Sequence, residues 1–360
     1  MKNPSFVYAL SFLLLLAAGC DEKKGSTVPP WPWQDPAPAD TVAQSDTSGT
    51  VDPIDPVGPS APEWADVTAE YGKLPAYVKI LKAPAKLQDQ NAVAFIADVD
   101  LSQTSFHVWG IKDIGTQGTT DSFKTPGQVY SDKGSPAVVI NGGFFFSDGG
   151  KRYAASLAAN NGDLLSTNIN YASQDWVSIY YPTRAVFLEH SDGSFEAAWS
   201  YYKSLSEHWI YQEPAENLWS DRPLKTPSAT FPVKGVAYEA VNGIGGGPVL
   251  LKGGEIKNTY RFELFDGSSG IGCTERHPRT AIGITSDKHL VLFVCEGRNM
   301  TPDVPGFTTA EVARILKDYG CTDAINLDGG GSSMMLAGGR ELIKSSDGKQ
   351  RSVASCVYIN

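Results

Sequence analysis

The chain has 360 residues, enough for a sizeable core, and a net charge of −10 from 40 acidic and 30 basic residues. This acidic balance argues against nonspecific nucleic-acid binding, which depends on a basic surface. Beyond the first twenty residues no segment approaches 18 consecutive apolar residues, so no transmembrane helix is expected there.

The first twenty residues have the pattern of an export signal. Lys2 supplies a positive start, and Phe6 to Ala18 form an almost unbroken apolar run that suits a signal peptide better than a membrane span. Small residues directly precede Cys20. This pattern resembles the lipobox of bacterial lipoproteins, in which the cysteine thiol is acylated and the chain is cut before the cysteine. An ordinary secretory signal with a chance cysteine is the alternative. We expect a signal peptide at residues 1–19, a lipid anchor on Cys20, and a place in the cell envelope facing the periplasm or the exterior.

A polar segment follows the anchor. Residues 20–62 are rich in Pro, Asp, Ser, Thr and Gly, and they hold too few aliphatic side chains to offset the entropy lost on ordering. This composition predicts a disordered stalk at residues 20–62 and one folded domain at residues 63–360.

Strand-like apolar runs dominate the folded part. They are Ala92–Val99, Ala137–Ile140, Trp176–Tyr180, Ala185–Leu188, Ala281–Thr285, Leu290–Val294, Ala324–Leu327 and Val353–Ile359. The runs at 281–285 and 290–294 are joined by a short polar turn and predict a hairpin. One helix is clear, because Thr308 and Glu311 form a capping box, apolar residues follow at helical spacing, and Gly320 stands at the end. We therefore predict an α+β domain with a mixed β-sheet and packed helices, preceded by the disordered stalk.

Cysteines are concentrated in the C-terminal third. An exported chain permits disulfides, and four cysteines allow three pairings. One or two disulfides are expected among Cys273, Cys295, Cys321 and Cys356. No CxxC motif occurs and the histidines are scattered, so neither a zinc site nor another cofactor is predicted.

Three segments share a pattern in which an apolar stretch runs into glycines and polar residues, at Val138–Phe145, Asn242–Pro248 and Ile325–Ser333. Such turns let backbone N–H groups approach a ligand or form an anion-binding nest, although each alone is also an ordinary turn. Polar clusters stand at both ends of the predicted hairpin, His277–Thr280 before it and Cys295–Arg298 after it. Both ends of a hairpin lie at one edge, so Arg279, Glu296 and Arg298 are expected to face one cleft, where arginine suits phosphate. Two surface arginines paired with acids would be the simpler interpretation.

Taken in order, these motifs resemble the phosphodiester glycosidase family. The matching segments are NGGFF at 141–145, GGGP at 245–248, HPRTAIG at 277–283, EGR at 296–298, the TTAE start of the helix, NLDGGGSS at 326–333 and RSVA at 351–354. The resemblance covers roughly Ala92 to Asn360 and implies hydrolysis of a sugar–phosphodiester bond in an envelope polysaccharide or glycoconjugate. One departure is Glu296, which stands where many members have Asp.

The chemistry of that bond suggests a role for each candidate residue. Glu296 and Asp328 are the candidate acid/base or nucleophile pair, although Asp328 could simply form a turn and Glu296 a salt bridge. Arginine side chains and glycine N–H groups would bind the phosphate, and polar side chains would position sugar hydroxyls. These binding residues are Arg279, Arg298, Gly142, Gly143, Gly246, Gly329, Gly330, Asn141, Asn326 and Ser332. His277, before Pro278, is more typical of a structural residue than of a base.

Two other functions compete. The rings between Tyr201 and Trp219 could stack on sugars, which would suit a non-catalytic carbohydrate-binding surface lipoprotein. A serine hydrolase using Ser332 is the weaker alternative, because the sequence has no Gly-x-Ser-x-Gly elbow.

Overall fold

The structure is a computed structural model that describes residues 62–175, 177–219, 225–266 and 271–360. The proposed signal peptide, the lipid anchor at Cys20 and nearly all of the proposed stalk lie outside the described residues. The residues from Ala61 to Asn360 belong to one compact unit, which holds the whole predicted folded domain. Neither α-helix in the described ranges is long and apolar enough to cross a bilayer.

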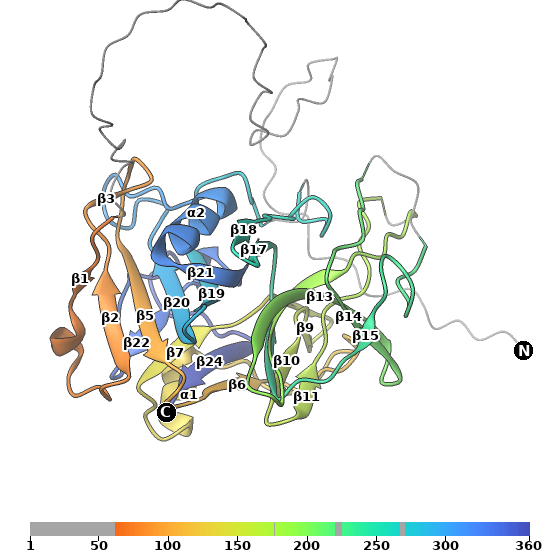
Figure 1. Ribbon diagram of the computed structural model, residues 1–360, viewed down its shortest axis with the longest axis horizontal. Helices are drawn as coiled ribbons and strands as arrows, with labels where there is room; N and C mark the ends of the chain where they lie inside the picture. The colour runs from red at the N-terminus through yellow and green to blue at the C-terminus, as the bar shows by residue number, and fades with distance from the viewer. Residues whose placement is uncertain (1–61, 176, 220–224, 267–270) are drawn as a thin grey trace, which may run out of the picture. The chain divides into compact units, whose positions relative to one another are not determined.

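Three antiparallel β-sheets build this unit (Figure 1). The eight-stranded sheet has the order β1 (Ala65–Asp66), β2 (Val78–Lys82), β5 (Ala94–Asp100), β20 (His289–Cys295), β19 (Arg279–Thr285), β21 (Cys321–Asn326), β17 (Val249–Lys252) and β18 (Glu255–Ile256). The seven-stranded sheet has the order β11 (Asp163–Ser166), β10 (Ala158–Asn160), β16 (Asn242–Gly245), β12 (Arg184–Glu189), β13 (Phe195–Ser204), β14 (Glu207–Tyr211) and β15 (Val236–Ala237).

The five-stranded sheet has the order β23 (Arg340–Glu341), β22 (Met335–Ala337), β7 (Val138–Asn141), β24 (Ser355–Ile359) and β6 (Phe106–Gly110). Two small hairpins add β3 (Lys86–Leu87) with β4 (Gln90–Asn91), and β8 (Phe145–Asp148) with β9 (Lys151–Ala154). The α-helices of the described ranges are α1 (Pro126–Asp132) and α2 (Thr309–Tyr319), and short 3₁₀ turns occupy Thr68–Tyr71 and Gly330–Ser332.

The prediction of an α+β domain with a mixed sheet was wrong, because strands dominate and every pairing between the named strands is antiparallel. Strands β20 and β21 precede and follow helix α2, but they do not pair with each other. Both strands instead pair with β19, which lies between them and runs antiparallel to each. The helix therefore crosses over an intervening strand, and the sheet gains no parallel pair.

Most individual elements agree with the sequence. Seven of the eight predicted runs fall on β5, β7, β12, β19, β20, β21 and β24, and β19 pairs with β20 as the predicted hairpin. The run at Trp176–Tyr180 is the exception. Trp176 lies outside the described residues, and Tyr180 belongs to no named strand but forms an isolated bridge with Ala172.

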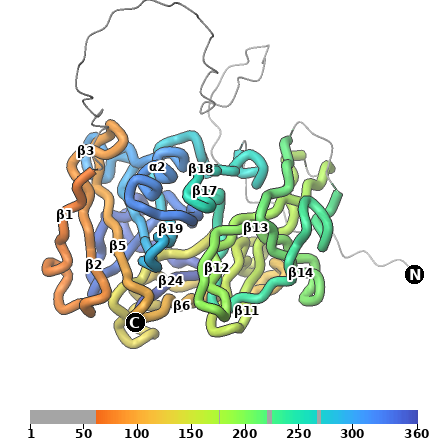
Figure 2. Tube along the Cα trace, viewed as in Figure 1, coloured from red at the N-terminus to blue at the C-terminus, as the bar shows by residue number. Residues whose placement is uncertain are grey.

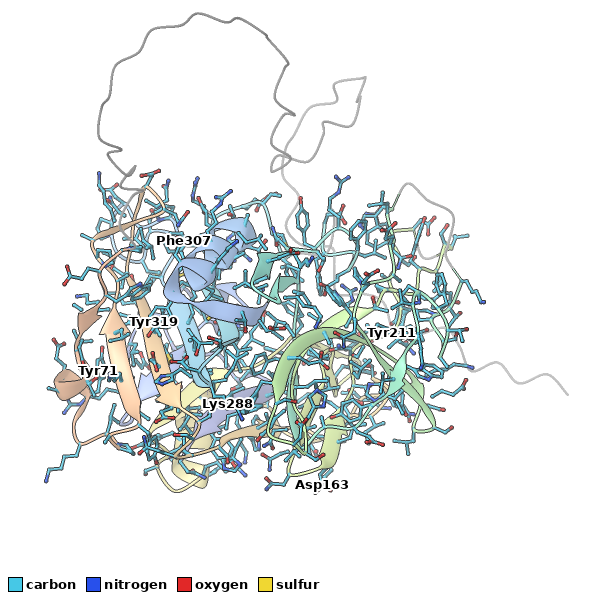
Figure 3. The ribbon with its side chains drawn as sticks, viewed as in Figure 1. Tyr71, Asp163, Tyr211, Lys288, Phe307 and Tyr319 are labelled. Carbon is cyan, nitrogen blue, oxygen red and sulfur yellow. The ribbon has the colours of Figure 1, made fainter. Side chains whose placement is uncertain are left out.

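Helix α2 begins and ends where its capping residues predict. The Thr308 side chain accepts the N–H of Glu311, the Glu311 side chain accepts the N–H of Thr308, and Gly320 closes the helix in the left-handed conformation. Phe307, just before the helix, and Tyr319, its last residue, are labelled in Figure 3. Figure 2 shows α2 covering one face of the sheet at β19.

The core has two main apolar clusters, one on each face of the eight-stranded sheet. Alternate side chains of a strand point to opposite faces. Leu292 of β20 thus packs into the larger cluster, which all three sheets share, whereas Phe293 packs beneath α2 with Val312 and Leu316. Burying each such side chain contributes about 1.5–3 kcal/mol. Because this sheet is covered on both faces, the loops at its edge are attached to a well-packed scaffold.

The predicted disulfides are absent from the described residues, where Cys273, Cys295, Cys321 and Cys356 are buried free thiols. Cys295 pairs with one end of β19 and Cys321 with the other, at Arg279 and Thr285. Six residues of strand separate those positions by about 20 Å, whereas a disulfide needs Cα atoms within about 7 Å. Cys356 lies in a different apolar cluster again. The number of cysteines gave no information on these distances.

Candidate active site

A pocket of about 130 Å³ opens at one edge of the eight-stranded sheet. Arg279 at the start of β19 pairs with Cys295 at the end of β20, and Ala281 pairs with Asn326 at the end of β21, so all three strand ends meet there. The residues that line the pocket are Phe144, Ile271, His277, Arg279, Arg298, Asp328, Gly329, Gly330, Gly331 and Arg351. The structure thus brings Arg279 and Arg298, from the two ends of the hairpin, to one cavity that Asp328 also lines.

Asp328 lies in the turn that follows β21, and the end of β7 fixes its backbone. Its N–H donates to the carbonyl of Gly142 over 3.0 Å, and its carbonyl accepts a hydrogen bond from Nδ2 of Asn141 over 2.7 Å. The residue keeps some exposure at the pocket wall, while protein atoms enclose its carboxyl group closely. This burial raises the pKa of Asp328 to about 6, against hydrogen bonds from Ser332 and Gly329 and the charge of Arg351 that lower it. A carboxyl group with such a pKa can take up or release a proton near neutral pH.

Arg351 joins the same network from the segment before β24. Its Nη1 donates to Oγ of Ser332 over 3.2 Å, while its Nε and Nη2 contact a carboxylate oxygen of Asp347 at 2.8 and 2.7 Å. Ser332 itself is buried and does not line the pocket. The serine thus holds Arg351 and Asp328 in fixed relation to each other.

Arg298 reaches the pocket from another segment, the one that follows β20. It follows β20 in the left-handed conformation, its side chain is exposed, and Nη1 lies 3.4 Å from Oγ of Ser346. A Cβ atom added to Gly330 would come within 2.9 Å of its Nη2, so glycine at this positive-φ position leaves room for the guanidinium. With one weak side-chain hydrogen bond among the described residues, Arg298 is available to an anion in the pocket.

Arg279 differs from Arg298 although both are arginines at the hairpin ends. Its side chain is buried, and it donates four hydrogen bonds to the carbonyls of Phe307, Ile271, Gly272 and Glu275, at 2.8, 3.1, 2.5 and 2.7 Å. These bonds use four of the five N–H donors of a guanidinium. Arg279 therefore shapes the pocket wall by holding the 271–275 segment, and its charge still contributes to the potential of the pocket.

His277 lines the pocket between these arginines. Its Nε2 lies 3.1 Å from Oε2 of Glu275, and its Nδ1 is buried with no hydrogen-bond partner among the described residues. Burial, followed by the charges of Arg279 and Arg298, lowers the pKa of His277. The neutral imidazole of His277 therefore adds a polar side chain to the wall of the pocket.

Glu296 does not line the pocket. It is buried, Oε1 accepts the N–H of Lys344 over 3.0 Å, and Oε2 has no hydrogen-bond partner in the described part of the chain. The bond to Lys344 anchors the segment whose Ser346 and Asp347 contact Arg298 and Arg351. The structure thus separates the two carboxylates that the sequence paired, and it connects Glu296 to both arginines through the backbone.

The predicted amide and glycine groups mostly serve the scaffold. Oδ1 of Asn141 accepts from Thr280 and Met334, and Nδ2 of Asn326 donates to the carbonyls of Gly247 and Leu327. The N–H groups of Gly142, Gly143 and Gly246 donate to Ser355 and Ala185, and their missing Cβ atoms allow contacts that would be 2.3 Å with any side chain. Only Gly329 and Gly330 of the predicted glycines line the pocket.

Sequence reasoning missed Phe144, Ile271, Gly331 and Arg351 as pocket residues. In the sequence Arg351 stood out only as the first residue of the RSVA segment at 351–354. The one signal that could have found it is the pair Asp347 and Arg351, an acid and a base four residues apart. No group of three or more metal-ligating His, Cys, Asp or Glu side chains occurs within the ranges that the structure describes.

The aromatic stretch that suggested carbohydrate binding is mostly part of the core. Tyr201 and Tyr202 on β13 and Tyr211 on β14 are buried, and Figure 3 labels Tyr211 on the seven-stranded sheet. These three rings therefore offer no exposed platform.

Two solved structures have a fold similar to that of this chain. The catalytic domain of zebrafish N-acetylglucosamine-1-phosphodiester alpha-N-acetylglucosaminidase, solved as auto-inhibited by its pro-peptide, is similar with a TM-score of 0.51 and 20% identity, covering 84% of this chain and 89% of that one. A hypothetical protein from Synechocystis is similar with a TM-score of 0.50 and 17% identity, over 78% of this chain and 62% of that one. At such identities the two structures show a shared fold alone.

The SPbeta prophage-derived uncharacterized protein YomE of Bacillus subtilis (strain 168) is 36% identical over 85 residues, which are 24% of this chain. The match spans only 13% of the length of that curated relative. The family model for phosphodiester glycosidase matches residues 135–360, which is more than half of the chain and includes every residue that lines the pocket. The chain belongs to the phosphodiester glycosidase family.

Proposed function

We propose that this protein hydrolyses the bond between the anomeric carbon of a sugar and a phosphodiester, at the pocket that holds Asp328, Arg298 and Arg351. The observation that carries the proposal is a single carboxyl group with a raised pKa among three arginines in one cavity. An anionic substrate needs the positive charge, and a glycosyl transfer needs the carboxylate.

The two accessible arginines are the phosphate-binding groups of this mechanism. Arg298 and Arg351 project from different segments toward the same cavity, and both keep N–H donors in planar forks that suit phosphate oxygens. Arg279 adds charge from the wall while its own donors hold the 271–275 segment. The guanidinium groups of Arg279, Arg298 and Arg351 outnumber the carboxylates of Asp328 and Asp347, so the pocket favours a diester that carries a negative charge before and after cleavage.

Asp328 acts in its ionised form. A phosphate leaving group departs readily, so it needs less help from a general acid than an ordinary alcohol does. Asp328 accepts a proton from water while the water oxygen bonds to the anomeric carbon, and the carbon–oxygen bond to phosphate breaks with its electron pair on phosphate. The products are a free sugar and a phosphomonoester, which the arginines stabilise as its charge grows.

The envelope setting belongs to the same proposal and rests on the N-terminal sequence alone. A signal peptide at 1–19, acylated Cys20 and a polar stalk would hold the pocket outside the cytoplasm, facing the periplasm or the exterior. Sugar phosphates of envelope polysaccharides or glycoconjugates are the substrates that such a location offers. Labelling of the expressed protein with a radioactive fatty acid, compared with Cys20→Ser, tests the anchor directly.

A hydrolysis screen tests the activity. Full-length protein is incubated with nucleotide sugars and with synthetic glycosyl phosphodiesters, and release of reducing sugar is measured beside Asp328→Asn. Release of reducing sugar by the wild-type protein, but not by Asp328→Asn, supports the proposal. Binding of the phosphodiesters with no release of sugar contradicts it and favours the non-catalytic carbohydrate-binding alternative. Loss of activity after treatment with a serine-reactive phosphonate would instead favour Ser332 as a nucleophile.

A further inference from the structure

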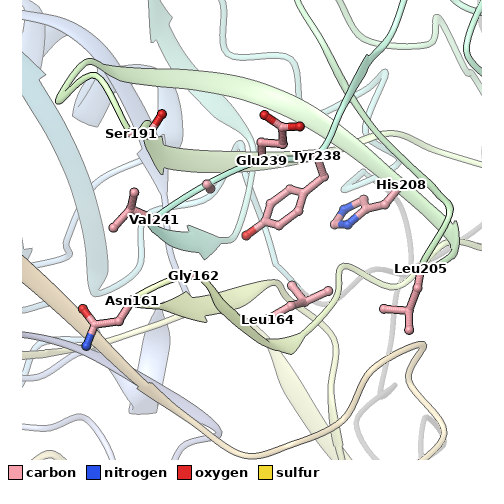
Figure 4. Close-up of a pocket in the computed structure, with 10 residues that line it drawn as sticks. Asn161, Gly162, Leu164, Ser191, Leu205, His208, Tyr238, Glu239 and Val241 are labelled. Carbon is pink, nitrogen blue, oxygen red and sulfur yellow. The ribbon is translucent and has the colours of Figure 1, made fainter.

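A second, larger pocket of about 550 Å³ lies on the seven-stranded sheet, away from the arginine cluster (Figure 4). The turn between β10 and β11 forms one side, and the segment from Tyr238 to Val241, which leads from β15 to β16, forms another. The residues that line it are Asn161, Gly162, Leu164, Ser191, Leu205, His208, Tyr238, Glu239, Ala240 and Val241. None of them lines the pocket of Asp328, so this cavity is a separate feature of the fold.

Two buried polar atoms of this pocket have no hydrogen-bond partner among the described residues. They are Nε2 of His208 and the hydroxyl oxygen of Tyr238, whose rings stack with centroids 4.3 Å apart and an interplanar angle of 11°. A buried polar group without a partner costs about 1–3 kcal/mol. Figure 4 shows the Tyr238 side chain extending between Leu164 and Val241. Retaining two such groups side by side in a cavity is understandable if a bound molecule satisfies them.

The lining is neutral to acidic and mixes apolar with polar groups. Among its ten described residues, Glu239 is the one carboxylate and there is no lysine or arginine. Burial lowers the pKa of His208 to about 4, so its imidazole is neutral at ordinary pH. Leu164 and Leu205 supply apolar surface, and the Leu205 side chain is unusually open for a leucine, with 74% exposure. This lining disfavours an anion and differs in that respect from the pocket of the three arginines.

A neutral sugar has the matching chemistry, because its ring presents C–H groups on its faces and hydroxyl groups around its edge. The cavity volume of about 550 Å³ also falls in the usual range of small-molecule sites, roughly 300–1,000 Å³. We propose that this pocket is an accessory site for a neutral saccharide unit, whose hydroxyls bond to Tyr238 and His208 and whose C–H groups pack on Leu164 and Leu205. The site stands independently of the hydrolytic function proposed above.

Calorimetric titration of the full-length protein tests this proposal, with cellobiose, maltose and N,N′-diacetylchitobiose as probes. All titrations use Asp328→Asn as the background, so that binding is measured without turnover and apart from the acid group of the other pocket. At least one disaccharide is expected to bind. Tyr238→Phe removes a hydroxyl that has no hydrogen-bond partner within the described ranges, and it should weaken that binding about 5- to 10-fold, the equivalent of one lost hydrogen bond.

Tyr211→Phe is the matched control, because its hydroxyl donates to the carbonyl of Ser228 over 2.8 Å and the residue does not line the pocket. It should lower the melting temperature and leave disaccharide binding unchanged. Tyr238→Phe, in contrast, should not lower the melting temperature, and it should leave hydrolysis of a small glycosyl phosphodiester unchanged in the otherwise wild-type protein. Failure of all three disaccharides to bind, or equal binding by Tyr238→Phe, would overturn the proposal and leave a cavity that holds only water.

Discussion

Arg351 donates a hydrogen bond from Nη1 to Oγ of Ser332 over 3.2 Å, and this contact links the segment before β24 to the turn that carries Asp328. A serine hydroxyl has one proton and two lone pairs. Because Ser332 accepts from Arg351 and bonds to the carboxyl group of Asp328, its proton is directed at that carboxyl. The hydroxyl therefore orients a candidate base and a candidate phosphate-binding residue together, which is a different role from that of a nucleophile.

Replacement of Asp328 by Asn is expected to abolish sugar-phosphodiester hydrolysis. The amide keeps the size of the side chain but cannot accept the proton of the attacking water, and a positioned base contributes about 10²- to 10⁴-fold to a rate. The measurement is kcat with a synthetic glycosyl phosphodiester. Circular dichroism and gel filtration should show an unchanged fold, because the main-chain contacts of residue 328 to Gly142 and Asn141 remain. Turnover within a few fold of wild type would refute the catalytic role.

The raised pKa of Asp328 predicts opposite pH trends for stability and rate. The folded state holds the proton more tightly than the unfolded chain, with a pKa of about 6 against 3.8. The contribution of this group to stability is therefore greatest at low pH, and it decreases by on the order of 2 kcal/mol as pH rises from about 4 to about 6. Over the same rise the ionised, active form accumulates, so kcat/KM should increase and level off above about 6.

Urea denaturation of wild type and Asp328→Asn from pH 4 to 8 isolates this effect, because all other titrating groups are shared. The variant should become the more stable protein as pH rises above about 6. If the difference in unfolding free energy between the two proteins does not change with pH, the pKa of Asp328 is not raised in the folded state.

Arg298 and Arg351 are expected to determine the affinity for the phosphodiester. Replacing either by Ala removes a charge-assisted hydrogen bond, worth about 1.5–3 kcal/mol, and should raise KM roughly 10- to 100-fold with a smaller change in kcat. Arg314→Ala, an exposed position on α2 outside the pocket, is the control and should leave KM unchanged. Equal KM values for all three variants would exclude the arginines from phosphate binding.

Local sequence signals predicted the elements that the structure confirms. The capping box of Thr308 and Glu311 and the apolar run Leu290–Val294 depend on residues close in sequence, and the structure has helix α2 and strand β20 at these positions. Arg279 and Arg298 show what local sequence signals do not predict. Their placement at one edge followed from the hairpin, but only the distant segments 271–275, 307 and 346 make one arginine a buried support and leave the other exposed.

The four buried thiols of the described domain are expected to be unreactive in the native protein. Burial raises the pKa of Cys273 and Cys295 to about 12, and it raises the pKa of Cys321 and Cys356 as well, so almost no thiolate is present at pH 8. Titration with a thiol reagent should find four additional reactive groups after denaturation in guanidinium. Reducing agent should leave the melting temperature unchanged. A drop in melting temperature on reduction would show that disulfides form after all.

Replacement of Glu296 by Gln tests whether this residue acts as a catalyst or as a support. Oε1 holds the N–H of Lys344, and the following residues Ser346 and Asp347 contact Arg298 and Arg351. Gln keeps an acceptor for that N–H, so a supporting role predicts a kcat within a few fold of wild type and an unchanged pH profile.

Glu296→Ala removes the acceptor and should raise KM about 10-fold, because losing one buried hydrogen bond of roughly 1–2 kcal/mol frees the segment that orients both arginines. A catalytic carboxylate would behave differently, since Gln and Ala would then lower kcat equally while KM stayed constant. The ratio of the two kcat values therefore distinguishes a second catalytic acid from a residue that positions the phosphate-binding arginines.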